Sequence, residues 1–234
     1  MTPEQFTQLR RSISAQLGQH LTGVFRALGS WRDPDAAKFA HTAVPMVAGA
    51  QRTLAQLVAL YMAAQASKAT GTAVSAPAIP ATAITGLRGV DPAVVYRRPF
   101  VATWTALSRG SDLPTAIDRG ADRLAKVAEG DLQQTHSSTA RAAMRALPNK
   151  PSGWRRVLVG PDNCVLCTAA STRTYSVEHL NPLHHNCNCR VEPVFGLRQV
   201  KNSDPAGYVM DHGELGPLLV YPRDSHVTPA DLPA

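Results

Sequence analysis

Apolar residues recur every three or four positions along the first segment of the chain: Phe6, Leu9, Ile13, Leu17, Leu21, Val24 and Leu28. This spacing places one apolar stripe on one face of a helix. Thr2 followed by Pro3 is a helix start signal, and Gly29 is a stop signal. The stripe, together with the run LAQLVALYM at 54–62, exceeds what one antiparallel helix pair needs. We therefore expect this part of the chain to make the main contacts with other proteins.

A second helix is predicted from Asp33, which caps it ahead of a proline, to about Gly71, with Pro45 as a point where it can kink. The next segment, 72–91, carries several Pro and Gly and no charge until Arg88. This composition predicts an extended, partly mobile connection.

The helical pattern resumes after this connection. Asp91 repeats the Asp-Pro opening and predicts a third helix, and the segment 112–147 predicts a fourth. Helix breaks are plausible in the fourth at Gly120, Gly130 and the run HSST at 136–139. The pattern predicts a helical domain over 1–150.

The pattern changes after the cluster PNKPSG at 148–153. The runs WRRVLVG and RVEPVF are typical of short strands, which predicts a small β-rich module over 151–195. The final residues, 196–234, are rich in Pro and Gly and predict an extended C-terminal arm, in which GPLLVY at 216–221 can dock as a strand. The expected fold class is α+β: an elongated helical N-terminal part, a small zinc-knuckle-like module and a trailing arm.

Charge is unevenly distributed along the chain. Residues 1–150 carry 17 Lys and Arg against 9 Asp and Glu, whereas residues 151–234 carry 7 against 8. The basic part is expected to make at most a weak, non-specific contact with DNA, through Arg10, Arg11, Arg97, Arg98, Arg109, Arg119, Arg123, Arg141 and Arg145. A solvated surface without DNA is the alternative.

Targeting signals are not expected. The N-terminus has an early acidic residue and no apolar core, so it does not read as a secretory signal. The most apolar stretch, 43–64, is interrupted by Gln51, Arg52 and Gln56, which favours a buried helix over a membrane span. We expect a soluble protein with no membrane partner, whose cysteines are kept reduced or bind metal.

The four cysteines fall within a 26-residue window, from Cys164 to Cys189. A module of this size usually needs a metal, a disulfide or a partner to be stable. Cys164 and Cys167 have the Cys-x2-Cys spacing of a zinc knuckle, and a second ligand pair follows in the decapeptide LNPLHHNCNC at 180–189. The predicted structural zinc ligands are Cys164, Cys167, Cys187 and Cys189, with His184 as a substitute ligand or as a hydrogen-bond donor to one.

Two other interpretations of the cysteines stay open. The thiols can be metal-free, packed or paired in a disulfide. A catalytic role is the second: a Cys-His nucleophile, a redox pair or a metal-dependent nuclease. The redox version lacks a βαβ pattern around Cys164 and Cys167, and the nuclease version lacks a further His or Asp pair to hold a catalytic metal. His179 and His185 are interpreted as ordinary histidines.

The segment from Trp154 to Pro193 resembles the C-terminal signature of the phage Mu F-like minor capsid, or head-morphogenesis, family. The resemblance lies in a Trp-led strand, Cys-x2-Cys, a small-residue segment ending in an aromatic residue, and Pro-x-His-x2-Cys-x-Cys. The positions concerned are Trp154, Cys164, Cys167, Tyr175, Pro182, His184, Cys187 and Cys189.

The resemblance implies a structural minor capsid protein of a tailed phage, in the head interior near the portal, with a role in head assembly or genome delivery. Its implied partners are the portal protein and, less directly, the major capsid or scaffold protein. It would reside in the host cytoplasm during assembly. The chain has no Ser/His/Asp ordering for protease chemistry, so no enzyme is expected. The alternatives are a DNA-binding accessory protein and a metal-dependent nuclease.

Overall fold

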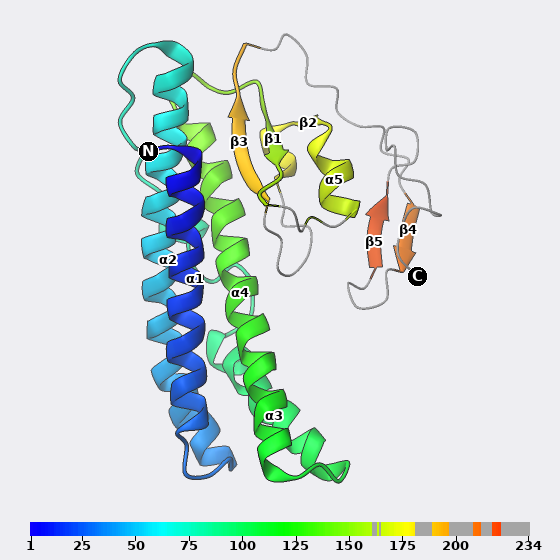
Figure 1. The fold of residues 1–234 in the computed structure, drawn as a ribbon. Helices are drawn as coiled ribbons and strands as arrows, with labels where there is room; N and C mark the ends of the chain where they lie inside the picture. The colour runs from blue at the N-terminus through cyan, green and yellow to red at the C-terminus, as the bar shows by residue number, and fades with distance from the viewer. Residues whose placement is uncertain (161–162, 164, 181–188, 197–207, 212–216, 221–234) are drawn as a thin grey trace. The chain divides into compact units, whose positions relative to one another are not determined.

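The structure is a computed structural model, and it describes residues 1–160, 163, 165–180, 189–196, 208–211 and 217–220. It is mostly helical with a small three-stranded sheet, which confirms the expected combination of helices and a sheet (Figure 1). The elements in chain order are α1 Pro3–Arg26, α2 Asp33–Thr70, η1 Ala81–Ala83, α3 Pro92–Ser108, α4 Leu113–Ala146, β1 Gly153–Val157, α5 Val165–Ser171, β2 Thr174–Tyr175, η2 Val177–His179, β3 Arg190–Val194, β4 Tyr208–Asp211 and β5 Pro217–Val220.

The chain divides into two compact units. The first, called the helical unit below, comprises residues 2–58 and 79–136; the second comprises residue 1 with 59–78 and 137–234. The long helices α2 and α4 each contribute residues to both units. In the described part of the chain, no helix combines the length and apolarity needed to cross a membrane.

Helix α1 begins as its sequence predicts. The hydroxyl of Thr2 accepts a hydrogen bond from the backbone N–H of Gln5 at 3.2 Å, while the Gln5 side chain accepts one from the backbone N–H of Thr2 at 2.8 Å. This reciprocal pair satisfies two backbone donors that the first helical turn leaves open. The helix ends at Arg26, before the predicted stop at Gly29.

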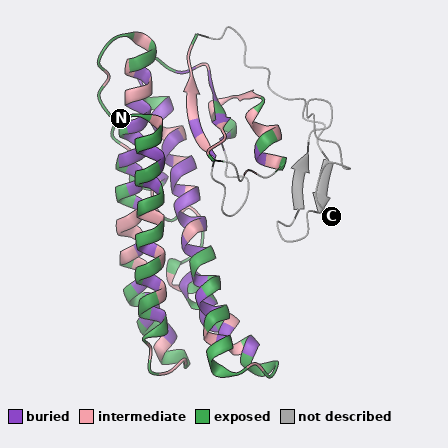
Figure 2. Cartoon of the chain, in the orientation of Figure 1, coloured by how far each residue is buried: buried purple, intermediate pink, exposed green. Residues whose placement is uncertain are grey.

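The core of the helical unit is built around three phenylalanines from three helices. Phe25 of α1 lies edge-on to Phe39 of α2 and to Phe100 of α3, with ring centroids 5.5 and 5.1 Å apart. Phe39 and Phe100 lie 5.6 Å apart, and all three side chains are buried. In Figure 2 the buried residues occupy the facing sides of the helices, as an apolar stripe requires.

The predicted breaks in the last helix are wrong, because α4 is continuous through Gly120, Gly130 and the run at 136–139. The structure gives a physical reason for Gly120. A Cβ atom there would lie 2.2 Å from Oγ1 of Thr103 and 2.8 Å from Cζ of Phe25. Glycine is thus needed for close packing of α4 against α1 and α3. Pro45 likewise lies inside α2 without ending it.

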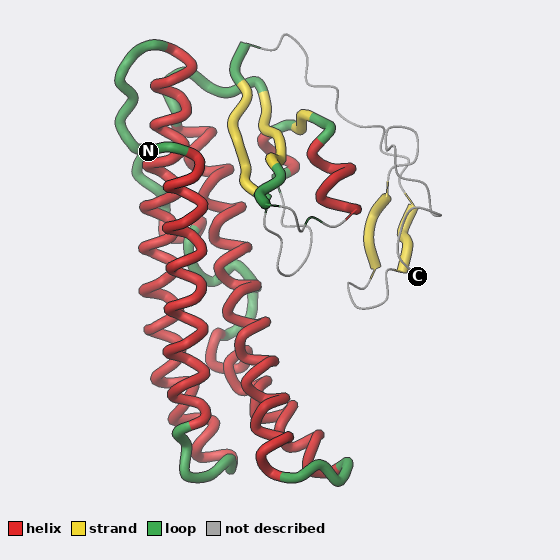
Figure 3. Tube along the Cα trace, viewed as in Figure 1, coloured by secondary structure: helices red, strands yellow, loops and turns green. Residues whose placement is uncertain are grey.

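Figure 3 draws most of the connection 72–91 as loop, apart from the short η1. Polar side chains of the helical unit hold its second half. The Oγ1 hydroxyl of Thr135 donates to the backbone carbonyl of Ile84 at 2.8 Å, and it accepts from Gln51 Nε2 at 3.0 Å. Arg88 pairs with the carboxylate of Asp131, which also accepts from Tyr96 Oη at 2.6 Å. Burial and the Asp131 carboxylate raise the pKa of Tyr96, so its hydroxyl stays a donor.

The three-stranded sheet has the order β2-β1-β3, and both pairs are antiparallel. Both runs predicted as strands form one: β1 begins one residue before WRRVLVG and covers its first four residues, and β3 covers all of RVEPVF except its last residue. Helix α5, which begins directly after Cys164, was not predicted. Strands β4 and β5 pair with each other inside the segment predicted as an extended arm. The docking predicted for 216–221 stays a prediction.

Candidate metal centre

The sheet module, residues 151–195, is organised around Trp154 of β1. Its ring stacks on that of Tyr175 of β2 at 4.9 Å between centroids, and its Nε1–H donates to the backbone carbonyl of Ser176 at 2.8 Å. The guanidinium carbon of Arg156 lies 5.1 Å from the Trp154 ring centroid, in range for a cation–π interaction. Trp154 is only 1% exposed, so it is a core residue and not an open stacking platform for a base.

Tyr175 connects this stack to α5. Its hydroxyl donates to the backbone carbonyl of Ala170 in α5 at 3.1 Å. Burial raises the pKa of Tyr175, so the phenol remains protonated and keeps this hydrogen bond at neutral pH. The short helix α5, and Cys167 on it, is thereby tied to the sheet.

Cys167 and Cys189 are brought together in this module. Cys167 lies on α5 and Cys189 directly precedes β3, and both are buried, with 2% and 4% of their surface exposed. They belong to one cluster, against which Leu158 packs. One cysteine of each predicted ligand pair therefore lies in the same buried cluster, and the two come from different parts of the module. A buried pair of sulfur donors from two elements fits a structural zinc site.

The other predicted ligands, Cys164, His184 and Cys187, lie outside the described residues. Within the residues that are described, no group of three or more His, Cys, Asp or Glu side chains could hold a metal ion. The described part of the centre thus consists of Cys167 and Cys189, and the completed ligand set stays a prediction.

His179 lies on the surface, as expected of an ordinary histidine. It ends η2, it is exposed, and its Nδ1 lies 3.2 Å from Oγ of Ser176. The other histidine interpreted in this way, His185, falls outside the described residues.

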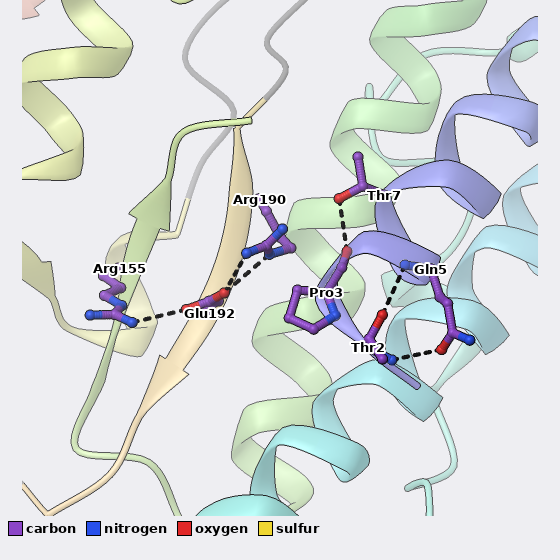
Figure 4. Close-up of polar contacts among 7 residues, drawn as sticks. All are labelled: Thr2, Pro3, Gln5, Thr7, Arg155, Arg190 and Glu192. Carbon is purple, nitrogen blue, oxygen red and sulfur yellow. Dashed lines mark hydrogen bonds and ion pairs between the residues drawn. The ribbon is translucent and has the colours of Figure 1, made fainter. Parts of the chain in front are cut away.

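Glu192 is a structural residue of the module that the sequence pattern did not single out. Its carboxylate accepts from Arg190 Nη2 at 2.7 Å on the same strand and from Arg155 Nη2 at 3.1 Å on β1 (Figure 4). Arg155 and Glu192 are directly opposed in the β1–β3 register. Opposite charges at opposed positions favour that register, which sets where Cys189 lies. The sequence signal for this role was the alternation of charge at Arg190 and Glu192, together with an arginine, Arg155, on the partner strand.

The predicted DNA-contacting arginines do not form one uniform basic surface. Arg10 is buried at 8% exposure. Arg97 donates to Asp33 at 2.6 Å, and Arg145 pairs with Glu178. Partial neutralisation by these carboxylates lowers the number of phosphates that such a surface could engage. The weak DNA contact stays a prediction.

A family model described as VG15 protein matches residues 2–214. VG15 is a family of phage gene products. Neither the curated proteins nor the solved structures contain a match to this chain.

Proposed function

This chain belongs to the VG15 protein family, a family of phage gene products, and from that premise we propose that it is a structural minor capsid protein. We place it in the head of a tailed phage, associated with the portal, where it acts in head assembly or genome delivery. During assembly it resides in the host cytoplasm.

The observation that carries this proposal is the core of the sheet module. Trp154, Tyr175, Cys167 and Cys189 belong to the signature by which the chain resembles the Mu F-like minor capsid family, and all four lie in or beside the small sheet. Trp154 and Tyr175 stack, and the two cysteines share a buried cluster. The residues of the resemblance thus have a joint structural role, which supports common descent over a chance match in spacing.

A structural zinc ion is part of the proposal. Its ligands would be Cys164, Cys167, Cys187 and Cys189, with His184 as a ligand or as a hydrogen-bond partner of one. Zinc binding would supply folding energy to a module whose described apolar core is small. The ion would have no catalytic role, because the proposed function is structural.

Purified heads test the proposed location. Heads would be prepared from wild-type phage and from a mutant that lacks the portal protein, treated with nuclease, and compared by quantitative mass spectrometry. We expect the chain in wild-type heads and its loss, relative to the major capsid protein, from portal-less heads. Equal amounts in both preparations would contradict portal association. Absence from wild-type heads, with recovery on phage DNA before nuclease treatment, would favour the DNA-binding alternative.

A further inference from the structure

The apolar stripe of α1 is divided between two rows in the structure. Phe6, Leu17 and Leu21 face the core, each no more than 5% exposed. Leu9 and Val24 remain 48% and 36% exposed. The core row continues through Phe25 and not through Val24. Phe25 follows Leu21 by four residues, so the two lie on the same face of the helix. An apolar row on α1 is therefore left at the surface of the helical unit.

An open cavity of about 300 Å³ lies beside this row, between α1 and α2. Ile13 and Leu17 of α1 and Met46 and Ala50 of α2 provide apolar lining. Polar groups on the α1 side come from Gln16 and His20. We call this cavity, with the exposed Leu9 and Val24, the α1–α2 groove. Two helices with an apolar floor and polar edges form the kind of groove that receives an amphipathic helix.

The charge around the α1–α2 groove is one-sided. Up to residue 90 the acidic residues are Glu4, Asp33 and Asp35, and these lie in the first turns of α1 and α2. Ile13 follows Glu4 by nine residues, about 13 Å along a helix, and Met46 lies farther still from Asp35. Arg52, exposed on α2, stands next to Thr53 of the groove lining. The cavity itself is therefore lined by no carboxylate of α1 or α2, and one cation, Arg52, stands next to it.

This charge pattern decides which occupant fits. A second copy of the chain carries a net charge of +7, so its overall charge opposes rather than complements Arg52. DNA phosphates would complement the charge, but they offer nothing to the aliphatic side chains of Leu9, Ile13 and Met46. A helix that carries both apolar and acidic side chains satisfies both features.

We propose that the α1–α2 groove docks an acidic amphipathic helix of the portal protein, with its apolar side chains in the groove and its carboxylates towards Arg52. This inference rests on the proposed function for the partner's place in the phage head. Beyond the proposed function, it identifies the contact surface on this chain and the acidic, amphipathic character of the partner segment.

The test measures binding of the full chain to purified portal protein of the same phage by isothermal titration calorimetry. Ile13→Glu and Met46→Glu each place a carboxylate in the groove, and both should lower the association constant at least about tenfold. The matched control is Ala15→Glu, because Ala15 is exposed on α1 and does not line the groove. It should bind as the wild type does. Arg52→Glu, at an exposed site that cannot disturb the core, should weaken binding and flatten its salt dependence.

Each other result has a defined meaning. If every groove variant, with melting temperature unchanged, binds portal protein as the wild type does, the inference is overturned while portal association stands. Failure of the wild type to bind portal protein, with normal incorporation into heads, overturns the portal as the source of the helix. Loss of DNA binding, or of a wild-type dimer in sedimentation, in the groove variants alone would assign the groove to DNA or to a second copy instead.

Discussion

In the helical unit, Phe25, Phe39 and Phe100 come from three helices and interlock through their ring edges. In the sheet module, the described buried side chains include one large aromatic, Trp154, and two cysteines, Cys167 and Cys189. The core of the helical unit thus consists of large apolar side chains packed against each other. The sheet module combines few apolar residues with sulfur donors, which is the arrangement expected where a metal replaces a core.

The largest effect is expected from removing a sulfur ligand of the sheet module. Cys167→Ser or Cys189→Ser should each abolish zinc binding and unfold residues 151–195, because metal binding contributes on the order of 10 kcal/mol in small zinc modules. The helical unit should keep its helical circular dichroism. Elemental analysis measures the zinc content, and limited proteolysis measures the unfolding of residues 151–195.

Controls for these variants lie in the same module. His179→Ala changes an exposed residue and should retain zinc and protease resistance. His184→Ala should lose zinc if His184 is a ligand, or weaken binding by roughly 10- to 100-fold if it supports one. A metal-free wild type with a protease-resistant module would instead show that the thiols are packed or paired with each other.

The next effect concerns the aromatic cluster of the helical unit. Phe100→Ala should lower the free energy of unfolding by about 3–5 kcal/mol, because it removes a fully buried ring that contacts Phe25 and Phe39. Val101→Ala, at the next position but 52% exposed, should change it by less than about 0.5 kcal/mol. Chemical denaturation followed by circular dichroism measures both. Equal losses in the two variants would mean that the cluster is not the core of this unit.

A smaller effect is expected at Gly120. Gly120→Ala should destabilise the helical unit by about 1–3 kcal/mol, because the new methyl group collides with Thr103 and Phe25 in a packed core. Gly18→Ala in α1 is the matched control, since no heavy atom lies within 4 Å of its added Cβ. Helix propensity alone should make that variant more stable, by up to about 1 kcal/mol. Stabilisation by both substitutions would contradict close packing at Gly120.

The smallest effect is electrostatic, at the start of α4. The backbone N–H of Thr115 donates to the Asp112 carboxylate at 2.8 Å, and this bond lowers the pKa of Asp112 below its ordinary 3.8. Because the pKa of Asp112 is lower in the folded state, its ionised carboxylate stabilises the fold above pH 3.8. This stabilisation is lost as the pH falls through the folded-state pKa of Asp112. Asp112→Ala should therefore be less stable than the wild type at neutral pH and equally stable in strong acid. Asp112→Asn, which accepts the same hydrogen bond without titrating, should stay close to the wild type at neutral pH.

The helices could be predicted from the sequence because their signals are local. The Thr2–Pro3 start, the Asp91–Pro92 opening and the three- and four-residue spacing each act within a few residues. The cap predicted at Asp33 is wrong, because α2 begins at Asp33 itself and the backbone N–H of Arg32 donates to the Asp35 carboxylate. Gly120 was misinterpreted because its role depends on Thr103 and Phe25, which are distant in the sequence. The division of the α1 stripe was missed for a related reason. Periodicity reports that a face is apolar, but the helices that pack against α1 decide which part of that face is covered.

The candidate metal centre was less predictable. Cysteine spacing predicted four sulfur ligands, and two of them, Cys167 and Cys189, lie in one buried cluster. Metal binding by these cysteines stays a prediction. Helix α5 was not foreseen, because VLCTAAS is too short for its periodicity to be recognised. The role of Glu192 depends on the β1–β3 register, and a register is set by pairing between separate strands.

Hydrogen–deuterium exchange of the full chain, with bound zinc and after its removal by a chelator, tests the contrast between the two regions most directly. Elemental analysis of the starting protein should give one zinc per chain. After chelation we predict faster exchange throughout 153–194, and unchanged protection in α1 and α3. A chain that carries no zinc and still protects 153–194, or one in which chelation exposes α1 and α3 equally, would contradict a metal-dependent module beside a self-sufficient helical unit.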